Sequence, residues 1–148
     1  MLVRPAREDD SDAVADVYVA SFAGLRYLPP LHTDDEKRAW IKNVVLHTWE
    51  VWVAEAASRV VGFASLSERT LELLYVHPDA QNRGAGTALL DAAKRQRPDG
   101  FRLWVFQRNE GARRFYVRHG CHLVELTDGS GNQEREPDAL YEWRPGRL

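Results

Sequence analysis

The sequence holds almost no cysteine, no long apolar run and little net charge. Cys121 is the only cysteine among 148 residues, which excludes an internal disulfide and a cysteine-built metal cage. No segment approaches the roughly 20 apolar residues that a membrane-spanning helix needs, and the first residues lack the apolar stretch of a signal peptide. With a net charge of −2, the sequence lacks the excess of positive charge that is typical of nucleic-acid-binding proteins. We therefore expect a cytoplasmic protein with neither a membrane nor a nucleic-acid partner.

The chain length and the spacing of the histidines indicate how many domains to expect and whether a metal site is present. A chain of 148 residues can bury a core but is too short for two ordinary domains, so residues 1–148 are expected to form one domain. His47, His77, His119 and His122 show no metal spacing supported by nearby carboxylates, and no metal is predicted. Cys121 follows a glycine at the start of a predicted strand, which favours a small buried residue.

Helix and strand patterns follow one another along the chain. Helical spacing of apolar residues, behind acidic or capping residues, covers residues 9–22, the stretch that begins at Thr33, and residues 84–95 and 109–119. Strands are predicted at residues 2–4, 51–54, 60–64, 71–76, 101–106, 123–126 and 140–143. The polar stretch 127–138 is longer than most hairpin loops, and long loops are more often functional or mobile than idle. Together these elements predict an α+β sheet domain.

The segment 81–87 reads Gln-Asn-Arg-Gly-Ala-Gly-Thr and lies between a predicted strand and a predicted helix. Its glycines let the backbone approach a ligand closely, and the helix start adds unpaired N–H groups and a positive dipole end. This arrangement suits a phosphate or pyrophosphate, although the glycines alone fit a tight turn that opens a helix equally well. Two familiar phosphate loops do not match. Leu89 stands where a Rossmann loop needs a third glycine, and Thr87 follows Gly86 where a Walker loop needs lysine.

The longer pattern over residues 71–94 resembles the acetyl-coenzyme A motif of the GNAT superfamily of N-acetyltransferases. The signature Gln/Arg-x-x-Gly-x-Gly/Ala is matched by Gln81, Gly84 and Gly86. Residues 103–120 resemble the next strand and helix of the family, with Asn109 at the helix cap and Tyr116 near its end. The resemblance implies a GNAT-like acyl-CoA N-acyltransferase fold, in which about four helices flank a mostly antiparallel central sheet.

The same resemblance implies an activity: transfer of an acetyl group from acetyl-CoA to a primary amine by direct attack in a ternary complex. The fourth and fifth strands would splay apart, and the pantetheine arm would lie in the gap. Backbone groups along Leu74, Tyr75 and Val76 would bind this arm, and Asn109 would reach it from its helix cap. The pyrophosphate would rest on Gln81, Asn82, Arg83, Gly84, Ala85, Gly86 and Thr87.

Two residues are candidates for the chemistry. Attack on a thioester builds negative charge on the carbonyl oxygen, which a fixed backbone donor can stabilise, and the departing thiolate needs a proton. By resemblance, Tyr116 would sit beside the sulfur as proton donor, although a core aromatic residue fits its helix face as well. Glu72 is the leading base candidate because it lies two residues before Leu74 in a strand. Thr70 and Trp104 stand where other family members carry a glutamate, and an exposed strand carboxylate is the alternative for Glu72.

The acceptor is left open by the sequence and is expected to be a small-molecule or protein amine. His32 and Tyr27 lie in the irregular segment between the first two helices, which often borders the acceptor site in this family. The loop 127–138 is a further candidate for that site. A non-catalytic acyl-CoA binding or sensing domain is the alternative to an enzyme, and a homodimer is kept as an option. A nucleotide-binding module of another fold is disfavoured by the two failed loop tests.

Overall fold

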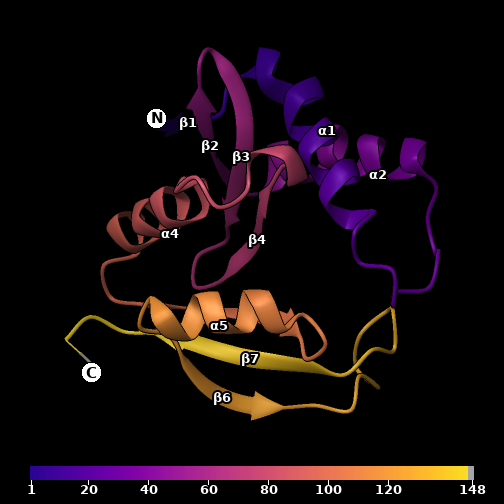
Figure 1. Cartoon of the computed structure of the whole chain (residues 1–148), viewed down its shortest axis with the longest axis vertical. Helices are drawn as coiled ribbons and strands as arrows, with labels where there is room; N and C mark the ends of the chain where they lie inside the picture. The colour runs from indigo at the N-terminus through magenta and orange to yellow at the C-terminus, as the bar shows by residue number, and fades with distance from the viewer. Residues whose placement is uncertain (147–148) are drawn as a thin grey trace.

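The computed structural model describes residues 1–146, and these residues contain two antiparallel sheets (Figure 1). The first sheet has the order β1-β2-β3-β4 and the second has the order β5-β7-β6. The strands are β1 Leu2–Pro5, β2 Glu50–Ala56, β3 Arg59–Leu66, β4 Leu71–Val76, β5 Phe101–Phe106, β6 His122–Leu126 and β7 Asp138–Trp143. The β2–β3 turn is tight because Ala57 and Ser58 both adopt positive φ angles, of 51° and 64°. The predicted α+β fold is confirmed.

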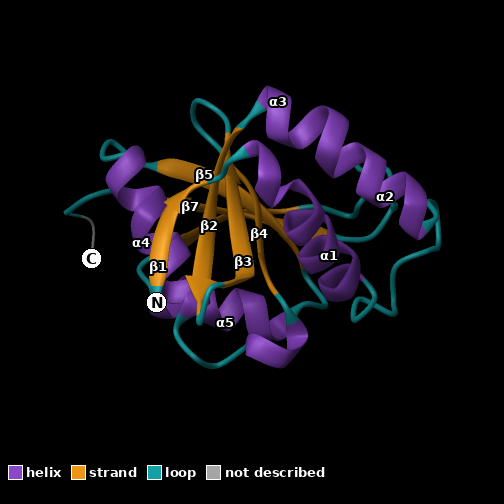
Figure 2. Cartoon of the chain, turned by 90° about the horizontal axis from the view of Figure 1, so that it is seen from above, coloured by secondary structure: helices purple, strands orange, loops and turns teal. Residues whose placement is uncertain are grey.

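Helices cover both faces of the first sheet, with α1 and α2 on one face and α4 and α5 toward the other (Figure 2). The helices are α1 Ser11–Phe22, α2 Asp34–Trp40, α3 Leu46–Thr48, α4 Ala85–Gln96 and α5 Glu110–Arg118, with short turns at η1 Glu8–Asp10, η2 Ile41–Val45 and η3 Pro78–Ala80. Thr33 and Glu36 form a capping box at the start of α2, with N–H···O distances of 3.1 and 2.8 Å. No helix within residues 1–146 is long and apolar enough to cross a bilayer.

Two apolar clusters hold these layers together. One lies between the first sheet and α1 with the 34–48 helical stretch, and Val14, Ile41 and Phe63 are fully buried in it. The other packs α4 against the first sheet and joins it to β5 and β7 through Leu89, Leu103 and residues around them. Cys121 is 3% exposed within this second cluster, as expected of a small buried residue. Burial on both faces therefore holds β3 in place, and β3 in turn holds the partly buried β4 beside the gap described next.

Within residues 1–146, the backbones of the two sheets pair at one bridge between β4 and β5. Thr70 pairs with Arg102 in parallel orientation, and the Arg102 amide donates to the Arg69 carbonyl at 3.0 Å. Beyond this bridge, in the described part of the chain, β4 pairs only with β3 and β5 pairs only with β7. The two strands consequently leave facing edges unpaired, which is the splay that the family resemblance implied.

Candidate active site

The free edge of β4 presents backbone groups to the gap. The His77 amide donates to the Val61 carbonyl of β3 at 2.8 Å. Because backbone groups of a strand alternate between its two sides, the amides and carbonyls of Leu74 and Val76 point away from β3. The Val76 carbonyl confirms this direction, since it accepts from Ser21 Oγ at 3.0 Å and from Gln81 Nε2 at 3.3 Å. Tyr75 faces β3 with its backbone, so only its side chain borders the gap.

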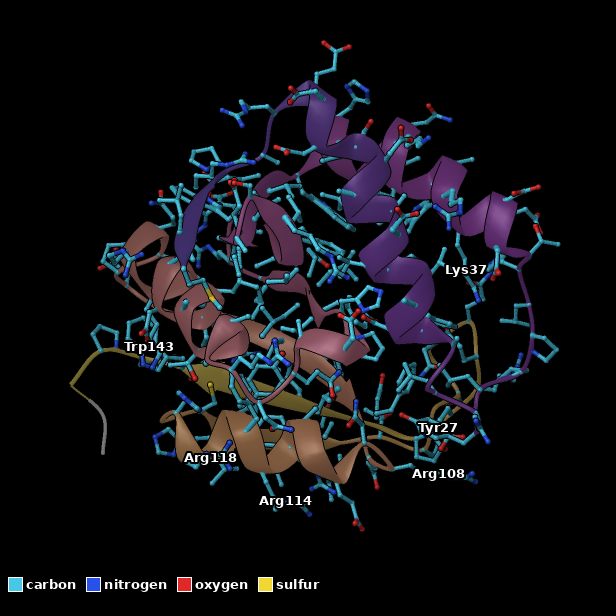
Figure 3. All side chains as sticks on the ribbon, turned by 45° about the horizontal axis from the view of Figure 1, so that its top comes forward. Tyr27, Lys37, Arg108, Arg114, Arg118 and Trp143 are labelled. Atoms are coloured by element: carbon cyan, nitrogen blue, oxygen red, sulfur yellow. The ribbon has the colours of Figure 1, made fainter. Side chains whose placement is uncertain are left out.

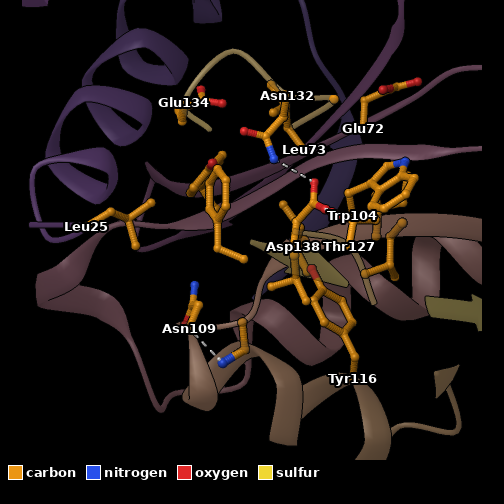
Figure 4. A pocket seen from close by; sticks show the side chains of 18 of the residues that line it. Leu25, Glu72, Leu73, Trp104, Asn109, Tyr116, Thr127, Asn132, Glu134 and Asp138 are labelled. Carbon is orange, nitrogen blue, oxygen red and sulfur yellow. Dashed lines mark hydrogen bonds between the residues drawn. The ribbon is translucent and has the colours of Figure 1, made fainter. Parts of the chain in front are cut away.

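A cavity of about 710 Å³ opens from this gap (Figure 4). Side chains from β4, β5, α5 and the loop 127–138 line it. Those that the sequence singled out are Glu72, Leu74, Tyr75, Asn109 and Tyr116. These residues are far apart in the sequence, and they surround one cavity because it lies between the separated ends of β4 and β5.

Tyr116 reaches the cavity from α5 and is almost completely buried, with 7% of its surface exposed. Its hydroxyl makes no hydrogen bond to any residue of the described part of the chain. Burial raises the pKa of the Tyr116 phenol, and the neighbouring Cys121 adds to the rise. The phenol therefore stays protonated at neutral pH, which is the state that a proton donor needs.

Glu72 lies at an irregular point of β4. Leu71 pairs with Leu66 and Leu73 pairs with Ser65, so Glu72 is the extra residue of a β-bulge. Strict two-residue alternation, on which its placement beside Leu74 was predicted, is interrupted here. The side chain nevertheless lines the cavity, half-buried, with no hydrogen bond or ion pair to another described residue.

The segment 81–87 turns sharply into α4. Gly84 has a φ of +91° and Asn82 a φ of +63°, and α4 begins at Ala85 with no side-chain cap. The first N–H groups of this helix are therefore left without a capping acceptor, which is the property of an anion site. Gly86 packs against α5, because an added Cβ would lie 3.4 Å from the Phe115 ring.

The side chains of this segment have different surroundings. Ala85 is buried, so only its backbone can reach a phosphate, while Arg83 is exposed. The Thr87 hydroxyl lies 3.0 Å from His119 Nε2, which ties α4 to the end of α5. Asn109 caps α5 by accepting the Ala112 amide at 3.2 Å and also lines the cavity.

The loop 127–138 forms one wall of the cavity, and its individual residues were not identified from the sequence. Asn132 Nδ2 donates to the Glu136 carbonyl at 2.8 Å and to Asp138 at 3.1 Å, and Asn132 Oδ1 accepts the Glu136 amide. Thr127 donates to Asp138 as well. These bonds order the loop, and Asn132, Glu134 and Asp138 line the cavity. The length of the loop was the only signal for it in the sequence.

His32 and Tyr27 lie outside the set of residues that line the cavity. His32 is exposed, with Nε2 3.3 Å from Gln133 Oε1 of the long loop. The Tyr27 ring packs edge-on against Phe106, 6.1 Å between ring centroids, and Arg108 lies over it at 5.7 Å (Figure 3). Burial raises the pKa of Tyr27, whose hydroxyl is buried without a hydrogen-bond partner among the described residues. Both residues therefore contact segments that carry the cavity wall, but neither lines the cavity itself.

A sheet that parts between two parallel strands, with an uncapped helix start near the gap and a buried tyrosine beside it, is the arrangement of an acyl-CoA N-acyltransferase. The family model of the acetyltransferase (GNAT) domain matches residues 47–120. The chain belongs to this family, as its motifs predicted, and the family is one of acyltransferase enzymes.

Named relatives and a solved structure agree with this assignment. The chain is 34% identical over 86 residues to the peptidyl-lysine N-acetyltransferase YiaC of Escherichia coli, covering 57% of this chain and 58% of that protein. It is 32% identical over 104 residues to the L-amino acid N-acyltransferase MnaT of Escherichia coli, covering 61% and 59%. The chain thus spans somewhat more than half the length of these two relatives. The structure of PaiA N-acetyltransferase from Thermoplasma acidophilum in complex with coenzyme A shares the fold, with a TM-score of 0.75, 21% identity and coverage of 97% and 98%.

Proposed function

We propose that residues 1–148 form one N-acetyltransferase domain that moves an acetyl group from acetyl-CoA to a primary amine by direct attack in a ternary complex. The observation that carries this proposal is the unpaired gap between β4 and β5, which has a free strand edge and Tyr116 in its wall, with the uncapped start of α4 beside Val76 at one end of that edge. Membership of the GNAT family supports it.

The residues present fit acetyl-CoA. The uncapped N–H groups at the start of α4 suit its pyrophosphate, with Asn82 and Gly84 supplying the left-handed turn and Arg83 a nearby cation. The edge groups of Leu74 and Val76 suit the amides of its pantetheine arm, because a strand-like ligand can pair with an open strand edge. Gln81 and Asn109 flank this path through their contacts with Val76 and with the start of α5. When bound, acetyl-CoA supplies the acetyl group as an activated thioester.

The chain's own groups then divide the proton transfers. Glu72 takes one proton from the acceptor ammonium, whose ordinary pKa is about 10. The amine nitrogen forms the C–N bond as the C–S bond breaks, and the electron pair of that bond stays on sulfur. Tyr116 gives sulfur its proton and regains one from the nitrogen as the amide forms. The Leu74 amide is placed to stabilise the carbonyl oxygen, and positioning of the reactants is worth on the order of 7 kcal/mol or more at best.

The proposal is tested by isothermal titration with acetyl-CoA and by thiol release across a panel of primary amines. Saturable acetyl-CoA binding together with amine-dependent coenzyme A release is the expected result. Binding without release for every amine tested would refute the enzyme and leave a non-catalytic acyl-CoA sensing domain.

A homodimer is part of the same proposal. Among residues 1–146, strand β6 pairs only with β7, and no described strand covers its outer edge. Leu123, Val124 and Leu126 on it are 46%, 47% and 54% exposed, and a second copy would cover them. Light scattering should give twice the chain mass, and Leu126→Lys should give the single mass. A single mass for the unmodified chain would refute the dimer. The cytoplasmic location stays a prediction.

A further inference from the structure

The cavity carries side-chain charge of one sign. Glu72, Glu134 and Asp138 line it, whereas none of its described lining residues is lysine, arginine or histidine. Asp138 is held by Thr127 and by Asn132, 3.1 Å away, and so serves the loop itself. Glu72 and Glu134 make no hydrogen bond or ion pair to any residue in the range 1–146. Two carboxylates are therefore available to a bound molecule.

The two available carboxylates come from different walls. Glu72 is on β4, two residues beyond the bridge between Thr70 and Arg102, and Trp104 occupies the matching position on β5. Glu134 is on the long loop and lies close enough to Tyr18 and Tyr75 to add to the rise that burial causes in their pKa. In Figure 4 the labelled Glu134 and Glu72 appear on either side of Asn132. A molecule in the cavity can meet one carboxylate with each of two separate groups.

A second, independent feature points to a ligand at this place. The Tyr116 hydroxyl is carried by a side chain that is 93% buried, lines the cavity and has no hydrogen-bond partner in the described chain. The hydroxyl itself opens into the cavity and does not belong to the fully buried polar atoms, so it can donate to or accept from a bound group. Trp104 is 50% exposed at the cavity, and its ring face can hold an alkyl chain or a cation.

We propose that the acceptor is a primary alkylamine whose chain carries a second positive charge and no carboxylate near the reacting nitrogen. This inference rests on the proposed acetyl transfer and names the substrate class of the same cavity. Glu72 faces the reacting ammonium, Trp104 covers the chain, and Glu134 pairs with the second cation. A free amino acid would bring its carboxylate among three carboxylates, and like charges placed together across an interface cost several kcal/mol.

Three acceptors of one chain length isolate the charge. Cadaverine carries a second ammonium, pentylamine a methyl group and δ-aminovalerate a carboxylate at the same end. With acetyl-CoA saturating, kcat/KM for cadaverine should exceed that for pentylamine by about tenfold, which corresponds to about 1.4 kcal/mol. The value for δ-aminovalerate should lie at least about tenfold below that for pentylamine. Equal kcat/KM values for the three amines, or values in the reverse order, would overturn the proposal.

A pair of charge-neutralising variants locates the preference. Glu134→Gln should bring the ratio of cadaverine to pentylamine close to one. Glu8→Gln removes the same charge from an exposed position of η1 outside the cavity and should keep the ratio of the parent protein. A ratio that is unchanged by Glu134→Gln would overturn the role of Glu134 and with it the proposed anchor.

Two outcomes of these assays separate the failure of this inference from the failure of the proposed function. Coenzyme A release with no charge preference overturns the acceptor class and leaves the acetyl transfer standing. If acetyl-CoA does not bind or no release occurs, the acetyl transfer falls, and calorimetric titration of the three amines still decides whether the cavity prefers the dication. Lysine peptides with a neighbouring lysine or glutamate distinguish a protein source from a free amine, and the lysine neighbour should be preferred.

Discussion

The turn that opens α4 offers the sharpest test of the proposed phosphate site, through the matched pair Gly84→Asn and Gly84→Asp. An added Cβ at Gly84 meets no atom within 4 Å, so neither side chain causes a clash. The φ of +91° is left-handed rather than the extended conformation of a capping residue, so neither side chain is set up to cap α4. The two variants therefore differ in one negative charge at the helix start.

The structure sets the expected magnitudes. A side chain in the left-handed region costs about 1 kcal/mol, or about 3 °C in Tm, and both variants should show this loss. Acetyl-CoA at 100 times its Kd should stabilise the parent by about 2.7 kcal/mol, or about 8 °C. A carboxylate about 4 Å from a phosphate charge costs about 4 kcal/mol at an effective dielectric constant of about 20. That cost lowers affinity several hundred-fold, on the order of 10²–10³, and removes the shift.

Thermal unfolding with and without acetyl-CoA, at one fixed ligand concentration, measures both quantities. Gly84→Asn should keep most of the ligand-induced shift, whereas Gly84→Asp should lose it at similar intrinsic stability. An equal shift in the two variants would show that no phosphate lies at the start of α4, and the assignment of the segment 81–87 would be withdrawn.

Two more predictions concern the proposed catalytic groups, and a third concerns the buried tyrosines. Tyr116→Phe keeps the buried ring and removes the proton donor, so kcat should fall on the order of 10²-fold while the acetyl-CoA shift in Tm stays the same; unchanged turnover would assign the proton to water. Glu72→Gln should lower kcat with partial rescue at high pH if Glu72 is the base, or raise KM alone if it only attracts the amine; kinetics identical to the parent would return it to a surface carboxylate. The pKa values of Tyr18, Tyr75 and Tyr116 are raised above 10, so the folded state binds protons more tightly and the free energy of unfolding should fall as pH rises above about 10. Urea titrations at pH 9 and 11 check this fall, and Tyr116→Phe should make it shallower; equal stability at both pH values would contradict it.

Most of the fold could be predicted because local signals agree with the tertiary structure. The capping box at Thr33 and Glu36 starts α2, and the Ala57–Ser58 turn closes the β2–β3 hairpin. The glycine that the family motif places at position 84 adopts the left-handed conformation that opens α4. In each case the information lies within a few adjacent residues, where propensity and hydrogen bonding act directly.

The details of the site depend on contacts between distant segments and were therefore out of reach. Whether Glu72 sits in a bulge depends on how Leu66 and Ser65 of another strand pair with β4. The roles of Asn132 and Glu134 depend on a loop that returns over β4 from the far end of the chain. Tyr27 and His32 lie in an irregular segment between two helices, and such a position does not determine which side chains form the cavity wall.

The gap itself follows from how the strand edges are shared. One edge of β5 pairs with β7, and one edge of β4 pairs with β3. The other edges of β4 and β5 face each other, and in the described chain they are bridged only at Thr70. Unpaired backbone groups in a partly buried place are unfavourable unless something satisfies them. Ser21 and Gln81 do this for the Val76 carbonyl with side-chain hydrogen bonds of 3.0 and 3.3 Å. Side chains can move aside where a third strand could not, so the fold keeps an edge open for a ligand that pairs like a strand.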